Sequence, residues 1–158
     1  MSKELLSRPK TLKSSASFAI VASEFNSRFV KGLIDHTNEE LTLLAPNASI
    51  VLHRVPGSFE IPILVRELAM QKKADAIIAV GVILKGETGH AENLARSVTD
   101  GLQRIALDSG VPVLNVVLNL NSEMQARERC LEDKINRGTE AARAAVAIVE
   151  TLSKLRGS

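Results

Sequence analysis

The run from Ala76 to Leu84 constrains the fold of this chain more than any other segment, because almost every residue in it is apolar. A strand that is apolar along its whole length must bury both of its faces, which is typical of a central strand in a parallel sheet. The polar, glycine-containing segment that follows, from Lys85 to Gly89, indicates a loop. The run therefore predicts a sheet with helices on both sides.

Other segments fit the same plan. Three short runs rich in apolar or β-branched residues are expected to be strands, at residues 17–22, 49–55 and 112–118. Helices are expected where apolar residues recur at three- and four-residue steps, at residues 27–44, 59–72 and 90–108, from N-cap residues 119–122 to about residue 132, and at residues 139–155. Strands that alternate with helices predict an α/β fold, a three-layer α/β/α arrangement with a four-stranded parallel sheet, flavodoxin-like in class.

Length and composition limit the organisation and the partners. The 158 residues suit one domain, expected over residues 16–158, behind a polar, flexible arm of residues 1–15. A formal net charge of +2 and the lack of a basic stripe argue against a nucleic-acid partner, and no apolar run is long enough to span a membrane. The single cysteine, Cys130, is expected to be a packing residue, and it favours a reducing, cytoplasmic location.

Ligands of open parallel sheets bind beyond the carboxyl ends of the strands. That rule selects three segments: Glu24 to Asn26, Pro56 to Ser58, and Lys85 to His90. In the third segment, a strand leads through glycines into a helix N-terminus, where free amide groups favour an anion such as a phosphate. A tight turn without a ligand is the equal alternative, and the segment matches neither the Walker A pattern nor GxGxxG.

Four side chains are candidates for chemistry or binding, each with an ordinary structural alternative. His90 is expected at the start of a helix, where the helix dipole opposes a positive charge and favours a neutral imidazole. Such an imidazole either acts as a base or only caps the helix. Phe25 either stacks on a heteroaromatic ligand or folds back into the core. Glu60 either accepts ligand hydroxyls or is a first-turn acid. One arginine of the stretch Arg127-Glu-Arg129 either pairs with a phosphate or lies on a solvated helix face. Of the other histidines, His36 is expected to be exposed.

Five segments together resemble the lumazine synthase (riboflavin synthase β-subunit) family. The resemblance runs from about Phe18 to Ala147, and all five segments occur in order and at family spacing. They are residues 20–26 (IVASEFN), 55–62 (VPGSFEIP), 81–90 (GVILKGETGH), 107–113 (LDSGVPV), and Asn136-Arg137-Gly138 with Glu140-Ala141-Ala142.

The resemblance implies an activity, a transferase reaction in riboflavin biosynthesis. In that reaction, 5-amino-6-ribitylaminouracil condenses with 3,4-dihydroxy-2-butanone 4-phosphate to give 6,7-dimethyl-8-ribityllumazine, phosphate and water. No metal and no organic cofactor takes part. Proximity of the two substrates supplies much of the acceleration, and one base adds proton transfer.

The resemblance also implies roles for individual residues. Phe25 stacks on the pyrimidine, Ser58 and Glu60 hold the ribityl chain, and His90 moves the proton. The remaining substrate positions are Asn26, the backbone of Val82, Ile83 and Leu84, Asn115, and Arg137. The phosphate positions are Gly86, Glu87, Thr88 and Arg129, of which Arg129 reaches the site from the adjacent subunit, so that a homo-oligomer built from pentamers is expected.

Four positions depart from the family pattern. Ala91 replaces an aromatic residue, Asn115 replaces an aromatic lid, Asn119 replaces a threonine and Arg137 replaces a lysine. Because none of these removes the base or the phosphate arginine, the sequence predicts activity, with a raised KM. One alternative is a paralogue that binds flavin or lumazine without making it. The other is a flavodoxin-like regulatory domain, but such a domain would need an acidic cluster at the strand ends, and this chain has no paired aspartates there. Members of the family that form shells of about sixty subunits usually carry a glycine in this stretch, so the lack of glycine in residues 131–135 makes the resemblance imply a pentamer or decamer.

Overall fold

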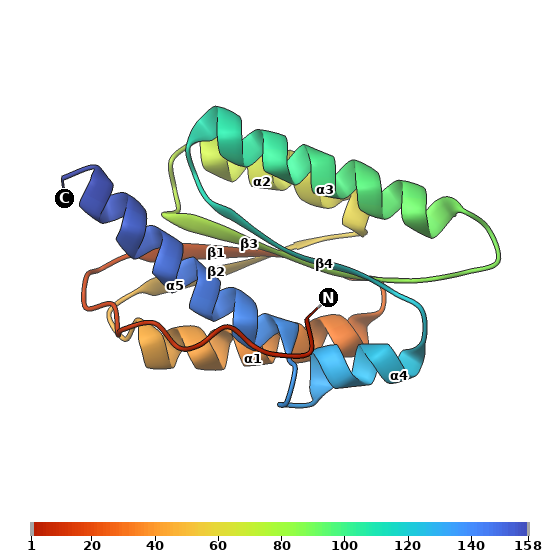
Figure 1. Cartoon of the computed structure of the whole chain (residues 1–158). Coiled ribbons are helices and arrows are strands. Elements are labelled where there is room, and N and C mark those ends of the chain that lie inside the picture. Colours follow the sequence, from red (N-terminus) through yellow and green to blue (C-terminus); the bar gives the residue numbers. More distant parts are fainter. Residues whose placement is uncertain (1, 158) are drawn as a thin grey trace.

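The computed structural model describes residues 2–157 as a three-layer α/β/α fold (Figure 1). Met1 and Ser158, the first residue of the expected arm and the last of the expected domain, lie outside the described residues. The sheet has four parallel strands in the order β2-β1-β3-β4: β1 (Ser17–Ser23), β2 (Ser49–Val55), β3 (Ala76–Leu84) and β4 (Val113–Leu120). β3 pairs with both β1 and β4 and is buried up to its last residue, as its apolar sequence predicts.

Helices cover the two faces of the sheet. α1 (Ser27–Leu44) and α5 (Arg137–Leu155) pack on one face together with the short α4 (Glu123–Ala126), and α2 (Ile61–Met70) and α3 (His90–Ser109) pack on the other (Figure 1). Each face has its own hydrophobic core, because alternate strand residues point to opposite sides. No helix within the described residues has the length and apolarity needed to cross a membrane.

The segment before β1 lies extended over α1 and α5 (Figure 1). The backbone of Leu12 donates to the carbonyl of Leu44 at 2.7 Å, and the Arg8 guanidinium donates two hydrogen bonds of 3.0 Å to the Glu40 carboxylate. Arg143 of α5 donates to the same carboxylate and to the carbonyl of Leu6. The flexibility expected for this arm stays a prediction.

Several boundaries differ from the sequence expectation. The helix expected over residues 59–72 begins with a 3-10 turn, η1 (Ser58–Glu60), and ends at Met70. β4 continues to Leu120, so Asn119 belongs to the strand, where pairing with β3 outweighs its polar character. The helix expected to reach residue 132 divides into α4 and a π-helical turn, η2 (Arg127–Leu131), which packs on α1. The last helix begins two residues early, because the Asn136 side chain caps it by accepting from two backbone amides.

Candidate functional site

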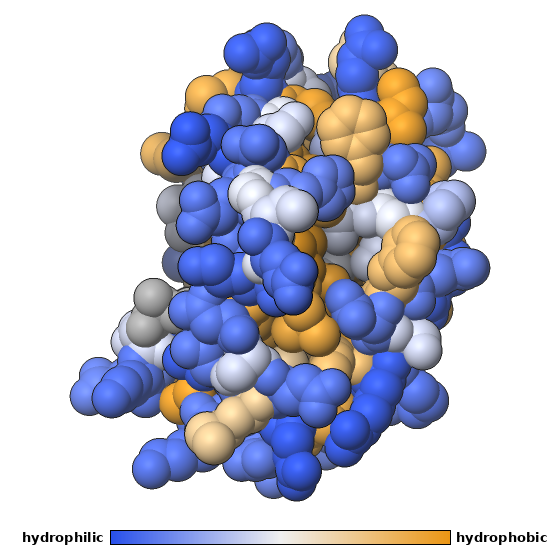
Figure 2. Space-filling view, turned by 90° about the vertical axis from the view of Figure 1, so that its right-hand side faces the viewer, coloured by the Kyte–Doolittle hydropathy of each residue, from blue (hydrophilic) through white to orange (hydrophobic). Residues whose placement is uncertain are grey.

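A cavity of about 740 Å³ opens at the carboxyl ends of β1, β2 and β3, where the strand order reverses around β1 and β3. This is the position that open parallel sheets use for ligands, and the volume is that of a small-molecule site. Figure 2 shows this end of the molecule, with apolar surface gathered in the middle of a hydrophilic face. The cavity is lined by Phe25, Asn26, Gly57, Ser58, Phe59, Glu60, Val82, Ile83, Leu84, His90, Asn93, Leu94 and Ser97.

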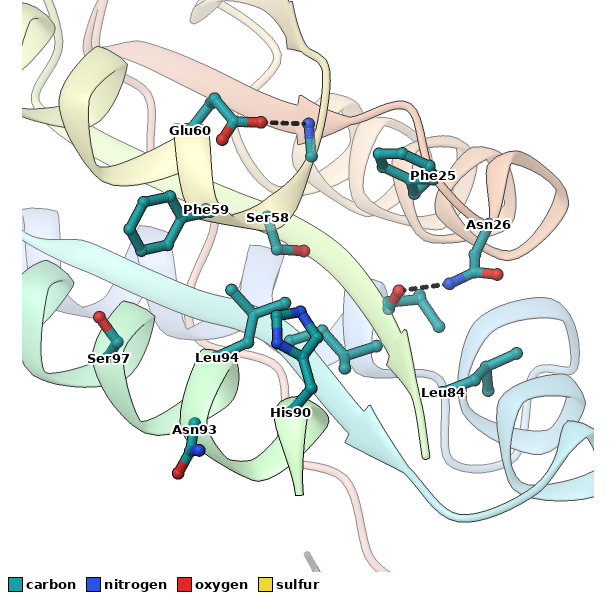
Figure 3. Close-up of a pocket in the computed structure, with 13 residues that line it drawn as sticks. Phe25, Asn26, Ser58, Phe59, Glu60, Leu84, His90, Asn93, Leu94 and Ser97 are labelled. Carbon is teal, nitrogen blue, oxygen red and sulfur yellow. Dashed lines mark hydrogen bonds between the residues drawn. The ribbon is translucent and has the colours of Figure 1, made fainter. Parts of the chain in front are cut away.

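The turn after β1 brings Phe25 and Asn26 to the cavity. Asn26 adopts the left-handed conformation, with φ 56° and ψ 46°, which asparagine tolerates better than most residues. Its side-chain amide donates to the carbonyl oxygen of Val82 at 2.6 Å and so ties this turn to the end of β3 (Figure 3). One lone pair of the Val82 carbonyl is thereby used within the protein.

Phe25 is 71% exposed, so the aromatic ring is not folded back into the core. A Cβ added to Gly57 would lie only 3.2 Å from the ring, which means that the ring sits directly over the glycine. Any larger residue at position 57 would push the ring aside. Gly57 therefore helps to hold an exposed aromatic face beside the cavity, as a stacking site requires.

The η1 turn, which directly follows Gly57, presents Ser58 and Glu60 to the cavity (Figure 3). Ser58 is nearly buried, with 6% of its surface exposed. Glu60 is half-buried, and one carboxylate oxygen, Oε1, accepts from the backbone N–H of Gly57 at 3.0 Å. That bond fixes the carboxylate at the first turn, where Glu60 lines the cavity.

His90 begins α3 and lies across the cavity from Ser58 (Figure 3). The imidazole is exposed, and the backbone N–H of His90 is 3.4 Å from the Thr88 hydroxyl. The loop residues Gly86, Glu87 and Thr88 are exposed beside His90 but do not line the cavity. The geometry thus places a proton-carrying group next to a loop with free amide groups.

Sequence reasoning missed one wall of the cavity. Asn93, Leu94 and Ser97 of α3 line it together with His90. The spacing from His90 is three, four and seven residues, which is one face of a helix. Helical spacing counted from His90, and not only along the apolar residues, would have identified these three residues. Phe59 was also missed, although it lies within a segment that carried the resemblance, whereas Gly57 belongs to the expected ligand segment Pro56 to Ser58.

Besides the loop residues Gly86, Glu87 and Thr88, three expected site residues lie outside this cavity. Arg129 belongs to η2, on the α1 face of the sheet; its side chain is 13% exposed, and its Nη1 lies 3.5 Å from Glu128 but has no hydrogen-bond partner in the described chain. Asn115 donates to the Thr99 hydroxyl at 3.2 Å and accepts from the backbone of Val117. Arg137 is buried and pairs with Glu140. The chain by itself therefore does not bring these three side chains to the other site residues.

Two further side chains lie outside the cavity. Cys130 is fully buried in η2, and burial raises the pKa of its thiol to about 12, in keeping with a packing role. The exposure expected for His36 is wrong, because its side chain is 19% exposed. The two ring nitrogens lie 3.0 Å from the carbonyl of Gly32 and 3.0 Å from Asp133, which hold the ring against α1. Nowhere in residues 2–157 do three or more His, Cys, Asp or Glu side chains group as metal ligands would.

The fold and the cavity define an α/β protein with a small-molecule site at the carboxyl edge of its sheet. Residues 15–153 match the family model described as 6,7-dimethyl-8-ribityllumazine synthase. The chain belongs to this family and is an enzyme of the lumazine synthase type.

Curated relatives agree with that assignment. Proteins named 6,7-dimethyl-8-ribityllumazine synthase include one from Leifsonia xyli, 43% identical over 143 residues, which cover 87% of each chain. The relative from Halorhodospira halophila is 39% identical over 141 residues, covering 89% of this chain and 90% of its own. The relative from Azoarcus is 36% identical over 138 residues, covering 87% and 86%. These names favour the enzyme over a binding paralogue.

Proposed function

We propose that this enzyme condenses 5-amino-6-ribitylaminouracil with 3,4-dihydroxy-2-butanone 4-phosphate to form 6,7-dimethyl-8-ribityllumazine, the penultimate step of riboflavin biosynthesis. The observation that carries the proposal is that one cavity joins Phe25, Ser58, Glu60 and His90, which come from separate segments of the chain. The exposed Phe25 ring suits a flat pyrimidine, and the polar Ser58 and Glu60 suit a polyhydroxylated chain.

The reaction requires that the two substrates lie close together and that one group transfers protons. The amine of the uracil attacks the ketone, and imine formation releases water; elimination then releases phosphate, and ring closure releases a second water. His90 is the group in the cavity suited to move these protons, because the two nitrogens of an imidazole ring can accept and donate a proton. The exposed amides of the Gly86–Thr88 loop at the start of α3 suit the leaving phosphate. The proposal requires neither a metal nor an organic cofactor.

Arg129 completes the proposed site from a neighbouring subunit of a homopentamer. In its own chain, Arg129 lies away from the cavity, and its partly buried guanidinium retains an Nη1 without a hydrogen-bond partner in the described residues. Asn115 and Arg137 are proposed to act at the same subunit boundary. Large apolar side chains exposed on α2 and η1, namely Phe59, Ile63 and Met70, are of the kind that subunit contacts bury. We place the assembly in the cytoplasm, as a pentamer or decamer.

The first test is synthesis of the lumazine by the wild-type enzyme, followed by its absorbance and fluorescence with both substrates present. A rate above the uncatalysed background supports the proposal. A wild-type enzyme that gives no lumazine even at saturating substrate contradicts it and favours the binding paralogue, for which a flavin titration is the next measurement.

Mixed oligomers test the shared site. His90→Ala and Arg129→Ala are each expected to be impaired, but their co-assembly at equal amounts restores both groups at about one quarter of the subunit boundaries of a ring. Recovered activity near that fraction supports a site built by two subunits. No recovery in oligomers that are shown to be mixed contradicts it. Light scattering that gives about sixty subunits contradicts the proposed assembly.

A further inference from the structure

Ser23, the last residue of β1, has a hydroxyl group that the fold leaves without a partner. The residue is 0% exposed, and its Oγ makes no hydrogen bond within the described chain. Ala19 and Val21, which precede it at alternate positions, point into the apolar core beneath α2 and α3. Ser23 is the next residue on that face, so a polar group stands where the pattern calls for an apolar one.

A buried hydroxyl without a partner lowers the stability of a protein, and such groups are rare unless they serve another purpose. Alanine would fit the same place with no polar atom. The serine at this position therefore needs a partner that its hydroxyl does not have among the described residues of the ligand-free chain.

Gly81 of β3 shows where that partner lies. A Cβ added to Gly81 would be 2.7 Å from the Oγ of Ser58 and 3.2 Å from the Oγ of Ser23. Both hydroxyls thus face the same empty point, and the absence of a side chain on Gly81 leaves room between them. The Cδ1 of Ile61 lies 3.3 Å from that point and closes the space on its apolar side. Ser58 lines the cavity, whereas Ser23 does not line it and is fully buried.

We propose that Ser23 is a positioning residue for recognition of a polyhydroxylated ligand. When a ligand is bound, Ser23 donates its hydrogen to the Oγ of Ser58, a hydrogen bond that the ligand-free chain does not make. This directs the Ser58 hydrogen into the cavity, toward a hydroxyl of the bound chain. A hydroxyl that accepts one hydrogen bond is a stronger donor in the next. The inference rests on the proposed function, in which Ser58 holds the ribityl chain, and it adds the residue that orients Ser58.

The test compares two ligands on wild type, Ser23→Ala and Ser23→Thr. The first ligand is 6,7-dimethyl-8-ribityllumazine, and the second is 6,7,8-trimethyllumazine, which has the same ring system with a methyl group in place of the ribityl chain. Ser23→Ala is expected to bind the ribityl compound about five-fold more weakly, the loss typical of one neutral hydrogen bond. Binding of the trimethyl compound should not change, and Ser23→Thr, which keeps the hydroxyl, should retain the discrimination.

Thermal unfolding of the ligand-free protein adds a second measurement, because a purely structural role of Ser23 would make Ser23→Ala lower the Tm. Because Ser23→Ala removes an unpaired buried hydroxyl, Tm should stay the same or rise while ribityl binding weakens. A lower Tm with unchanged binding of the ribityl compound, or equally weakened binding of both ligands, overturns this inference but leaves the proposed function standing. If the wild type neither makes the lumazine nor prefers the ribityl compound, the proposed function fails and the inference fails with it.

Discussion

Polar side chains have different surroundings in the two helical layers, one formed by α1 and α5 and the other by α2 and α3. In the first, the buried Glu40 carboxylate is held by Arg8 and Arg143, and α1 touches its neighbours so closely that a Cβ on Gly32 would lie 2.4 Å from the carbonyl oxygen of Cys130. In the second, Ser58, Glu60 and His90 face a cavity. One layer therefore pairs its polar group within the chain and packs closely, and the other leaves polar groups facing a cavity. We call the layer of α1 and α5 the rigid layer and the layer of α2 and α3 the open layer.

The difference also bears on the proposed subunit boundary. η2, which carries Arg129, packs against α1 of the rigid layer and not against the cavity of its own chain. A phosphate-binding arginine benefits from a fixed backbone, because positioning determines much of the energy of a charged hydrogen bond. The rigid layer of one subunit then completes the open layer of the next, as the proposed pentamer requires.

Replacement of Glu40 by glutamine should have the largest effect, and it should be on stability. Burial alone would raise the pKa of Glu40, but the hydrogen bonds and charges of Arg8 and Arg143 outweigh burial and lower the pKa below its ordinary value. The loss of the carboxylate leaves these arginines without their partner and should cost about 3 kcal/mol of unfolding free energy at pH 7. Denaturant unfolding measures this loss.

The pH dependence of stability checks the same group. A carboxylate with a lowered pKa in the folded state stabilises the protein above its ordinary pKa, near 4, and loses that contribution as the pH falls through the folded value. The difference in unfolding free energy between wild type and Glu40→Gln should therefore shrink below about pH 4. A difference that stays constant to pH 3 would show that the charge of Glu40 is not what stabilises this layer.

In the open layer, His90→Ala should lower kcat by about 100-fold, or about 2.7 kcal/mol, while stability stays unchanged. The side chain is exposed and makes no packing contribution comparable to that of Glu40. Initial rates of lumazine formation measure the effect, with His53→Ala of β2, outside the cavity, as the matched control. Equal losses in both variants would remove His90 from the mechanism.

Gly32→Ala should destabilise the rigid layer by about 2 kcal/mol, because the new methyl group meets backbone that cannot move without displacing η2. Gly101→Ala in α3 is the matched control. A Cβ at that position would lie 3.6 Å from Pro62, an ordinary contact, so the gain in helix propensity should leave Tm equal or higher. Thermal unfolding of both variants separates the two layers, and similar Tm changes would contradict the comparison.

The smallest effect should be the reaction of Cys130 with a thiol reagent. With a pKa of about 12, about one thiol in ten thousand is ionised at pH 8, and the side chain is fully buried. The native wild type should show no labelling in the time that unfolded protein needs to react. Gly32→Ala, which displaces η2, should be labelled faster than the native wild type. Rapid labelling of the native wild type would mean that η2 opens readily and that this layer is not rigid.

Local pattern in the sequence determined the number, type and order of the main elements. The apolar run of β3, the loops after β1, β2 and β3, and the candidates Phe25, Ser58, Glu60 and His90 all follow from hydrophobic periodicity, turn residues and family resemblance, since these signals lie within short segments. Local pattern failed at η2 and at the end of β4, where packing on α1 and pairing with β3 decide the conformation.

Only the tertiary structure decided which distant residues meet. The strand order β2-β1-β3-β4 brings the first three strand ends together and places Asn115 on an edge strand away from the cavity. Strand pairing and helix packing set Ser23 beside Ser58 across Gly81, and they join Glu40 to arginines more than thirty and one hundred residues away. Such contacts depend on register and packing between elements, which no short segment of sequence encodes.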